Sequence, residues 1–394
     1  MDDFSGGADT VEEASEVCRQ LKAGLKSGGF NIRKFGSNSN ELMSRIPVED
    51  REIANENIIK ALGLVWRPET DMFTYKLNMQ LSSLATTRRK LFSEVATLFD
   101  PLGLIAPIMT KAKILMREVW SLRKDGKRFS WDDQLPKEMS LSWARIKSEL
   151  PLITKLNIPR WIETTKNTKT ELHGFCDACN AAYAAEIYIK NWSESNEISV
   201  NLLVAKTKVA PIGKKTLTIP RLELCGAVLL ARLARSVMDT MKIDFADVVL
   251  WTDSKIVLAW LEGNPKRWKS FVAARVLKIK NKTQNAVWLH VSGIDNPADC
   301  ASRGIYPSEL ATHKLWWHGP KFLLQDVDKT PGKVDFETLI DTNRELSILN
   351  VTVKEPNILA QVSSWFKLQK IMAYVVRFVE NSKKDKVKTK GELT

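Results

Sequence analysis

The spacing of apolar residues in the middle of the chain predicts a mixed sheet with helices packed on it. A long amphipathic helix is expected over 220–241, a strand buried on both faces at 248–251, and a last strand at 287–291. Three consecutive strands are expected before that helix, at 172–178, 181–190 and 200–206. Antiparallel strands followed by alternating strands and helices are typical of an α/β fold with a mixed five-stranded sheet.

The segments before and after the sheet are mainly helical in pattern. A helix is expected over 9–27, with Thr10 three places before Glu13 as a capping box, and short strands at 30–35 and 61–66. From 86 to 161 helical spacing continues, broken at Asp100-Pro101-Leu102-Gly103, and a helix with a broad apolar face is expected over 363–381.

The charge of the chain favours a polyanionic partner. The 394 residues contain 59 Lys and Arg against 46 Asp and Glu, a net charge of +13. Nucleic acid fits this balance, although an anionic membrane attracts the same surface. No apolar run is long enough to span a membrane, the N-terminus is acidic where a signal peptide is basic, and the five cysteines are odd in number. We therefore expect an intracellular protein without a membrane partner.

Four carboxylates stand at informative places in the predicted sheet domain. Asp177 ends the first strand, Glu223 lies in the first turn of the long helix, Asp253 ends the 248–251 strand, and Asp299 begins a short helix. Each alone has an ordinary explanation as a turn, helix-dipole or capping residue. Together at one sheet edge they would repel one another unless cations neutralise them.

The ligand chemistry of this quartet suits Mg²⁺ or Mn²⁺. Hard oxygen ligands without a His or Cys cage favour these ions, and a pair of them is a known apparatus for in-line hydrolysis of phosphodiesters. The sequence thus predicts metal-assisted cleavage of a nucleic-acid backbone.

Four motifs resemble the ribonuclease H segment of BEL/Pao-type retrotransposon polyproteins. They are Phe175-Cys176-Asp177-Ala178, 219–224 (IPRLEL), 250–254 (LWTDS) and 290–304 (HVSGIDNPADCASRG). In addition, 92–103 (FSEVATLFDPLG) resembles the part that links polymerase to ribonuclease H in that family. The region around Trp365 resembles the segment before the integrase zinc module.

The resemblance implies a role for each carboxylate. The residue matching Asp177 bridges two ions, those matching Glu223 and Asp253 complete the shell of one ion, and the residue matching Asp299 holds the other. The mobile proton-shuttling His of the family has no secure counterpart: His290 is nearby, but the alignment on Trp288 places Ser292 at the expected position. Relatives also usually carry Ser where this chain has Cys179.

The extreme N-terminus resembles the end of a reverse-transcriptase catalytic hairpin, with Asp2 and Asp3 as the carboxylate pair. The third catalytic aspartate and the fingers are missing upstream of Met1. We therefore expect no polymerase activity from this chain alone.

Several other residues are candidates for nucleic-acid contact. Five of them are basic residues that come before Glu223 in the sequence. The other two lie further along the chain, beyond the helix that is expected after Asp253. The candidates are Lys206, Lys208, Lys214, Lys215, Arg221, Trp268 and Arg275. A solvated loop explains the lysines nearly as well. The pair Cys176-x-x-Cys179 lacks a second ligand pair at zinc spacing, so packing suffices to explain Cys176.

The sequence therefore predicts a polyprotein fragment whose ribonuclease H-like domain cleaves RNA in RNA–DNA hybrids. The alternative is an inactive retrotransposon remnant that only binds nucleic acid. Expected partners are the hybrid and the other polyprotein parts, in the cytoplasm, within a virus-like particle, or in the nucleus. The expected segments are a polymerase palm remnant (1–80), a helical thumb or connection region (81–165), the ribonuclease H-like domain (166–304), a linker (305–362), and a pre-integrase helix with a basic tail (363–394).

Overall fold

The computed structural model divides the chain into two compact units, Met1–Arg344 and Glu345–Thr394. The second unit contains helix α14 (Trp365–Asn381). None of the helices in the described part of the chain is long and apolar enough to cross a membrane. The structure describes residues 4–51, 59–61, 64–77, 87–124, 126–165, 168–193, 195–212, 217–327, 329 and 365–382.

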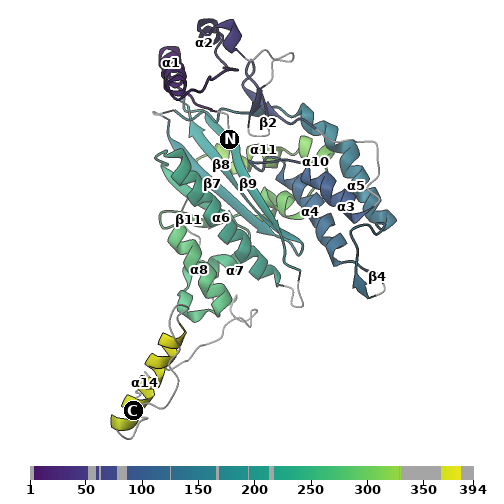
Figure 1. The fold of residues 1–394 in the computed structure, drawn as a ribbon, viewed down its shortest axis with the longest axis vertical. Helices are drawn as coiled ribbons and strands as arrows, with labels where there is room; N and C mark the ends of the chain where they lie inside the picture. The colour runs from purple at the N-terminus through teal and green to yellow at the C-terminus, as the bar shows by residue number, and fades with distance from the viewer. Residues whose placement is uncertain are drawn as a thin grey trace. The chain divides into compact units, whose positions relative to one another are not determined.

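The first unit is built on a mixed five-stranded sheet with the strand order β11-β10-β7-β8-β9 (Figure 1). β7, β8 and β9 are antiparallel, whereas β10 pairs parallel with β7 and with β11. β7 is buried along its whole length because helices cover both faces of the central strands. The predicted fold class is confirmed. The strands are β7 (Thr170–Ala178), β8 (Ala182–Trp192), β9 (Ile198–Val209), β10 (Asp247–Thr252) and β11 (Val287–His290).

One face of the sheet is covered by the long helix α6 (Ile219–Met241), which packs on β7 and β8. The contact is close at Gly226, where an added Cβ would lie 3.1 Å from the carbonyl oxygen of Asp177. Glycine thus lets the helix lie directly against the end of β7. Next to α6 lie α7 (Lys255–Glu262) and α8 (Ser270–Lys282).

The other face carries the predicted helical segment, which shares one hydrophobic core with the sheet. α4 (Ala106–Ser121) contacts β9 and the short helix α9 (Ala298–Arg303). At the loop before α4, Gly103 has φ +74°, and an added Cβ would lie 1.9 Å from the carbonyl oxygen of Ala205 on β9. The remaining elements here are α3 (Arg88–Ala96), β4 (Arg123–Lys124), β5 (Lys127–Arg128), α5 (Lys137–Glu149) and η2 (Leu150–Lys155).

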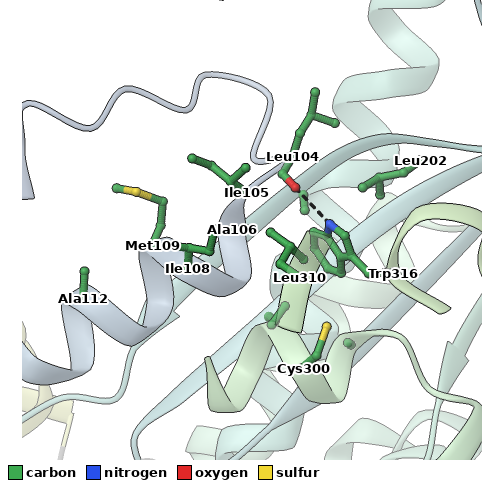
Figure 2. Close-up of a cluster of buried hydrophobic side chains, with 14 of the residues drawn as sticks. Leu104, Ile105, Ala106, Ile108, Met109, Ala112, Leu202, Cys300, Leu310 and Trp316 are labelled. Atoms are coloured by element: carbon green, nitrogen blue, oxygen red, sulfur yellow. Dashed lines mark hydrogen bonds between the residues drawn. The ribbon is translucent and has the colours of Figure 1, made fainter. Parts of the chain in front are cut away.

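The stretch that was expected to be a linker from residue 305 begins with ordered helices. Trp316 is fully buried in the shared core, and its indole N–H donates to the carbonyl oxygen of Leu104 at 2.9 Å (Figure 2). The hydroxyl of Tyr188 on β8 donates to the Trp316 carbonyl at 2.7 Å. The helices are α10 (Pro307–Ala311), α11 (Lys314–His318) and η5 (Lys321–Leu324). The domain boundaries themselves stay predictions.

The N-terminal part follows the sequence pattern only partly. Helix α1 (Val11–Ser27) begins as predicted, with the Thr10 hydroxyl accepting from the backbone N–H of Glu13 at 3.2 Å. The strand expected at 30–35 is wrong: only Phe35 forms an isolated bridge, with Arg51, and no strand among the described residues pairs with the rest of this segment.

The strand expected at 61–66 is two strands of a small sheet instead. Ala61 pairs with Leu64 in an antiparallel ladder, so the chain reverses inside the expected strand. The sheet has the order β1-β2-β3-β6, and its fourth strand comes from the end of the helical segment. Its strands are β1 (Ile59–Ala61), β2 (Leu64–Arg67), β3 (Met72–Thr74) and β6 (Ile158–Pro159). The other elements of the first unit are α2 (Asn40–Arg45), η1 (Val48–Asp50), η3 (Pro265–Arg267) and η4 (Gly293–Asp295).

Candidate nuclease site at the end of the central strands

Two of the predicted carboxylates lie side by side because of the strand register. β7 and β10 run parallel, and Thr252 is paired with Cys176. The next residue after each of this pair is an aspartate, Asp177 on β7 and Asp253 just after β10, so both lie at the C-terminal edge of the sheet. That edge is where ligands bind in open α/β sheets.

Glu223 approaches the same edge from the first turns of α6. Its Oε2 accepts a hydrogen bond from the Ser254 hydroxyl at 2.5 Å. The same hydroxyl accepts from the backbone N–H of Val257 at 3.2 Å and caps α7. Ser254, and not Asp253, is therefore the residue that caps α7. The Oδ1 atom of Asp253 is buried and has no hydrogen-bond partner in the described structure.

Asp299 comes from α9, which is fixed under the end of β7. The Asn296 side-chain N–H donates to the Cys176 carbonyl at 3.2 Å. Ser302 donates a short hydrogen bond to Oδ2 of Asp177. Arg303 donates from Nε to Oδ1 of Asp299 at 2.5 Å. All four predicted carboxylates thus lie at the same edge of the sheet, each brought there by a different segment of the chain.

The pKa values of three carboxyls show that the quartet is electrostatically coupled. Burial first, and repulsion from Asp253 and Asp299 after it, raise the pKa of Asp177 to about 6, against the hydrogen bond from Ser302. Burial and the charges of Asp253 and Asp177 raise the pKa of Glu223, although Ser254 opposes this. Burial and Asp299 raise the pKa of Asp253. Buried acids that lie near other acids behave in this way.

The donor set fits a hard divalent cation, while its present arrangement is not a closed metal cage. Carboxylate oxygens are the ligands that Mg²⁺ and Mn²⁺ prefer, and the partnerless oxygen of Asp253 is open to such a ligand role. In the described part of the chain, no three His, Cys, Asp or Glu side chains are grouped closely enough to hold a metal. Hydrogen bonds from Ser254, Ser302 and Arg303 hold the other three carboxylates instead.

A buried carboxyl that the sequence reading missed lies near Asp177. Glu186 on β8 is fully buried, and neither carboxyl oxygen has a hydrogen-bond partner within the described residues. Burial, and then the charge of Asp177, raise its pKa well above the ordinary value. The sequence offered no signal for this, because an acid inside a strand pattern normally indicates a solvent-facing position.

Replacing Glu186 by Met is expected to stabilise the protein by about 1–3 kcal/mol at neutral pH, since it removes an unsatisfied buried polar group of similar size. A raised folded-state pKa contributes stability below the unfolded pKa that is lost as pH rises, so the gain should be larger at pH 8 than at pH 5. Urea unfolding measures it, with the exposed Glu262→Met as the control. A loss of stability at both pH values would contradict this.

The basic candidates divide into two groups. Lys206 and Lys208 are exposed on β9. Arg221 on α6 and Arg275 on α8 lie over the same ring, with their guanidinium carbons 5.2 and 3.4 Å from the Phe271 centroid. The helix pair thus presents two arginines together. Lys214 and Lys215 lie outside the described residues, as do Asp2 and Asp3.

Trp268 is a correction. It is buried, and its indole N–H donates to the carbonyl oxygen of Trp260 at 3.2 Å, so its ring packs inside the protein instead of facing nucleic acid. Trp260 is buried as well, as its position on the apolar face of the helix indicates. The ring of Trp268 also covers Gly263, whose added Cβ would lie 2.7 Å from it.

The other residues singled out in the sequence have local roles. His290 is largely exposed; the partial burial of its ring and the charge of Lys255 lower its pKa, while a hydrogen bond with the Asp253 backbone raises it. Ser292 is exposed too. The Cys179 thiol donates to the Ser302 carbonyl at 3.2 Å, next to the hydrogen bond that holds Asp177.

Part of the first unit matches a known protein family. Residues 87–254 match the family described as Pao retrotransposon-like RNaseH-like domain. The chain thus contains a Pao-type, ribonuclease H-like domain. The matched range includes Asp177, Glu223 and Asp253 and ends before Asp299. It also begins inside the helical segment, which agrees with the shared core of helices and sheet in this Pao-type domain.

Solved structures similar to the chain include two ribonucleases H and a viral enzyme. The N-terminal RNase H domain of rv2228c from Mycobacterium tuberculosis is 14% identical over 34% of this chain and 94% of that one, with a TM-score of 0.23. RNase H1 from Halobacterium salinarum NRC-1 is 14% identical over 33% and 90%, with a TM-score of 0.22. The foamy viral protease-reverse transcriptase in complex with RNA/DNA hybrid is 10% identical over 60% and 29%, with a TM-score of 0.35. A search of the curated proteins returned no match.

Proposed function

We propose that the Pao-type domain hydrolyses the RNA strand of RNA–DNA hybrids, with divalent cations held by Asp177, Glu223, Asp253 and Asp299. The observation that supports this most is the convergence of four carboxylates from four elements at one sheet edge, with the pKa values of three of them raised. Such a cluster is stable mainly when cations neutralise it. Mg²⁺ or Mn²⁺ would supply Lewis-acid activation of the phosphate and of the attacking water.

The residues of the chain have distinct tasks in this proposal. Asp177 and Asp253 are fixed by paired strands, so they would place the cations at an invariable position on the sheet edge. Ser254 and Ser302 orient Glu223 and Asp177 through the hydrogen bonds that they donate. Such oriented carboxylates lose little freedom when a cation binds.

Basic side chains on the two sides of the edge would grip the substrate. Lys206 and Lys208 on β9, with Arg221 and Arg275 on the helix pair, are suited to contact phosphates rather than bases. Such contacts carry no sequence information, so we expect the domain to recognise the shape and the 2′-hydroxyls of the hybrid.

The test is cleavage of a hybrid whose RNA strand is end-labelled, by the full chain with Mg²⁺, with Mn²⁺ and with EDTA. We expect cleavage only with a divalent cation and only of RNA in the hybrid. Asp253→Asn should be inactive because it removes the negative charge of the carboxylate and replaces one of its two oxygens by an amide nitrogen, which does not bind Mg²⁺ or Mn²⁺. The matched control is Asp295→Asn, an exposed acid in the neighbouring η4 turn that should leave cleavage unchanged.

Two outcomes would contradict the proposal. Equal cleavage by Asp253→Asn and by Asp295→Asn would show that the four carboxylates do not take part in the reaction. Hybrid binding without cleavage by the unchanged protein would favour the inactive remnant, in which the pair of Arg303 with Asp299 is a structural substitute for a cation.

A further inference from the structure

A basic hairpin in the helical segment concentrates positive charge at a cost to folding. β4 and β5 pair antiparallel, with Arg123 opposite Arg128 and Lys124 opposite Lys127, and all four residues are exposed. Like charges directly opposite each other destabilise a strand pair, and a ribbon of two strands is only marginally stable by itself. An anionic partner would remove this repulsion.

Neighbouring acids neutralise only part of this charge. The Lys124 Nζ lies 3.6 Å from a carboxylate oxygen of Asp133, and Asp132 is paired with Arg89. The described structure gives no ion pair to the other three basic side chains of the hairpin. The dipole at the C-terminal end of α4 favours a nearby cation, but it does not require four.

Two exposed tryptophans lie close to the hairpin and are held in place by a stacked arginine. The guanidinium carbon of Arg88 lies 4.1 Å from the Trp120 ring centroid and 4.2 Å from that of Trp131. Arg88 itself is 6% exposed, whereas Trp120 and Trp131 are 44% and 42% exposed. Burial, and then the charge of Arg128 on the hairpin, lower the pKa of Arg88. Trp120 and Trp131 are also three residues away in the sequence from Arg123 and Arg128, the two ends of the hairpin.

This combination of exposed rings and unpaired cations matches one class of ligand. In a duplex the bases are stacked on one another and cannot reach a protein ring, whereas unpaired bases stack on exposed aromatic side chains. A lipid surface would satisfy the charges, but the apolar residues of α4, the helix that carries Trp120, are buried in the core, and Trp131 lies in the loop after β5. The two rings therefore do not belong to an exposed apolar helix face of the kind that enters a membrane surface.

We propose that the hairpin and the Trp120–Trp131 pair bind single-stranded nucleic acid, with phosphates on the basic side chains and an unpaired base on the rings. The site lies on the helical segment and uses none of the carboxylates of the sheet edge. It would hold the unpaired continuation of a strand whose paired part the sheet domain acts on.

The test is a binding assay with a labelled oligothymidylate and the full chain in EDTA. Fluorescence anisotropy measures the affinity at several salt concentrations. Lys127→Glu with Arg128→Glu should weaken binding and reduce the slope of log K against log salt by about 1.4, since each lost phosphate contact removes roughly 0.7. The matched control, Lys314→Glu with Lys321→Glu, makes the same change of charge on exposed lysines elsewhere and should leave the slope unchanged.

A second variant tests the rings independently of charge. Trp131→Ala should weaken binding roughly 5- to 150-fold through the loss of base stacking, while Trp131→Phe should retain most of the affinity. Thermal unfolding of both variants shows whether the fold is kept.

The proposal is overturned if the hairpin variant and its control bind the oligonucleotide equally. It is also overturned if the hairpin variant loses affinity for anionic phospholipid vesicles or for a duplex while single-strand binding is unchanged. Because a DNA single strand in EDTA is not a substrate, this result is independent of whether the domain cleaves hybrids.

Discussion

Replacing Asp177 by asparagine is expected to abolish hybrid cleavage and at the same time to make the metal-free protein more stable at pH 8. The burial of Asp177 and the charges of Asp253 and Asp299 raise its pKa from 3.8 to about 6. A carboxyl with a raised folded-state pKa contributes stability below its unfolded pKa, and this contribution is lost as pH rises through the folded pKa. Above pH 6 the wild type therefore carries a penalty that asparagine does not have.

The free energy of unfolding of Asp177→Asn at pH 8 is expected to exceed that of the wild type by on the order of 2–3 kcal/mol, from about two pKa units at about 1.4 kcal/mol each. Urea unfolding in EDTA at pH 8 and at pH 4 measures it, and the gain should nearly vanish at pH 4. Addition of Mg²⁺ should raise the unfolding free energy of the wild type and not that of the variant, because cation binding stabilises only the folded state that holds it.

Asp295→Asn again provides the control, since this exposed carboxyl is outside the quartet. A loss of stability in Asp177→Asn at pH 8 would show that the hydrogen bond from Ser302 outweighs the repulsion among the acids. An unchanged wild type on addition of Mg²⁺ would argue against cation binding at this edge.

Replacing Trp316 by alanine should destabilise the first unit by about 3–5 kcal/mol, the usual effect of truncating a buried large aromatic side chain. The loss includes the hydrogen bond to the Leu104 carbonyl, which joins α11 to the loop before α4. The measurement is thermal or urea unfolding, and aggregation on expression would be consistent with so large a loss.

The control for this effect is Trp161→Ala, because Trp161 is 52% exposed and should change stability little. Equal destabilisation by the two variants would contradict the expectation that the buried Trp316 contributes more to the stability of the first unit than the half-exposed Trp161.

The sheet and its carboxylates were predictable because their signals are local. A continuous apolar run identified β10, and the acid directly after it gave Asp253. The strand-like segment 172–178 identified β7 and gave Asp177 at its end. Ser302 and Ser254 were not predicted as partners of carboxylates, since a small hydroxyl leaves no mark in a pattern of apolar spacing. Their roles depend on side chains from distant parts of the chain meeting in three dimensions.

Two other differences between the predicted and the observed elements also arise because the sequence pattern of a segment does not show its neighbours in space. Helices as short as α10 and α11 span too few turns to show a period, so the sequence resembled a linker there. In the N-terminal part, residues 30–35 have the alternating pattern of a strand, but only Phe35 pairs with another described residue, and pairing decides whether a strand forms.

The close fit at Gly103 has a consequence for solubility. β9 is an outer strand, and such strands invite a second molecule to add its own backbone. Here the backbone N–H of Ala205 already donates to the Leu102 carbonyl at 2.8 Å, and the loop can come this near only because residue 103 has no side chain. The loop thereby shields that stretch of β9 from intermolecular strand addition. A single methyl group at position 103 would clash with the Ala205 carbonyl and force the loop away from the strand.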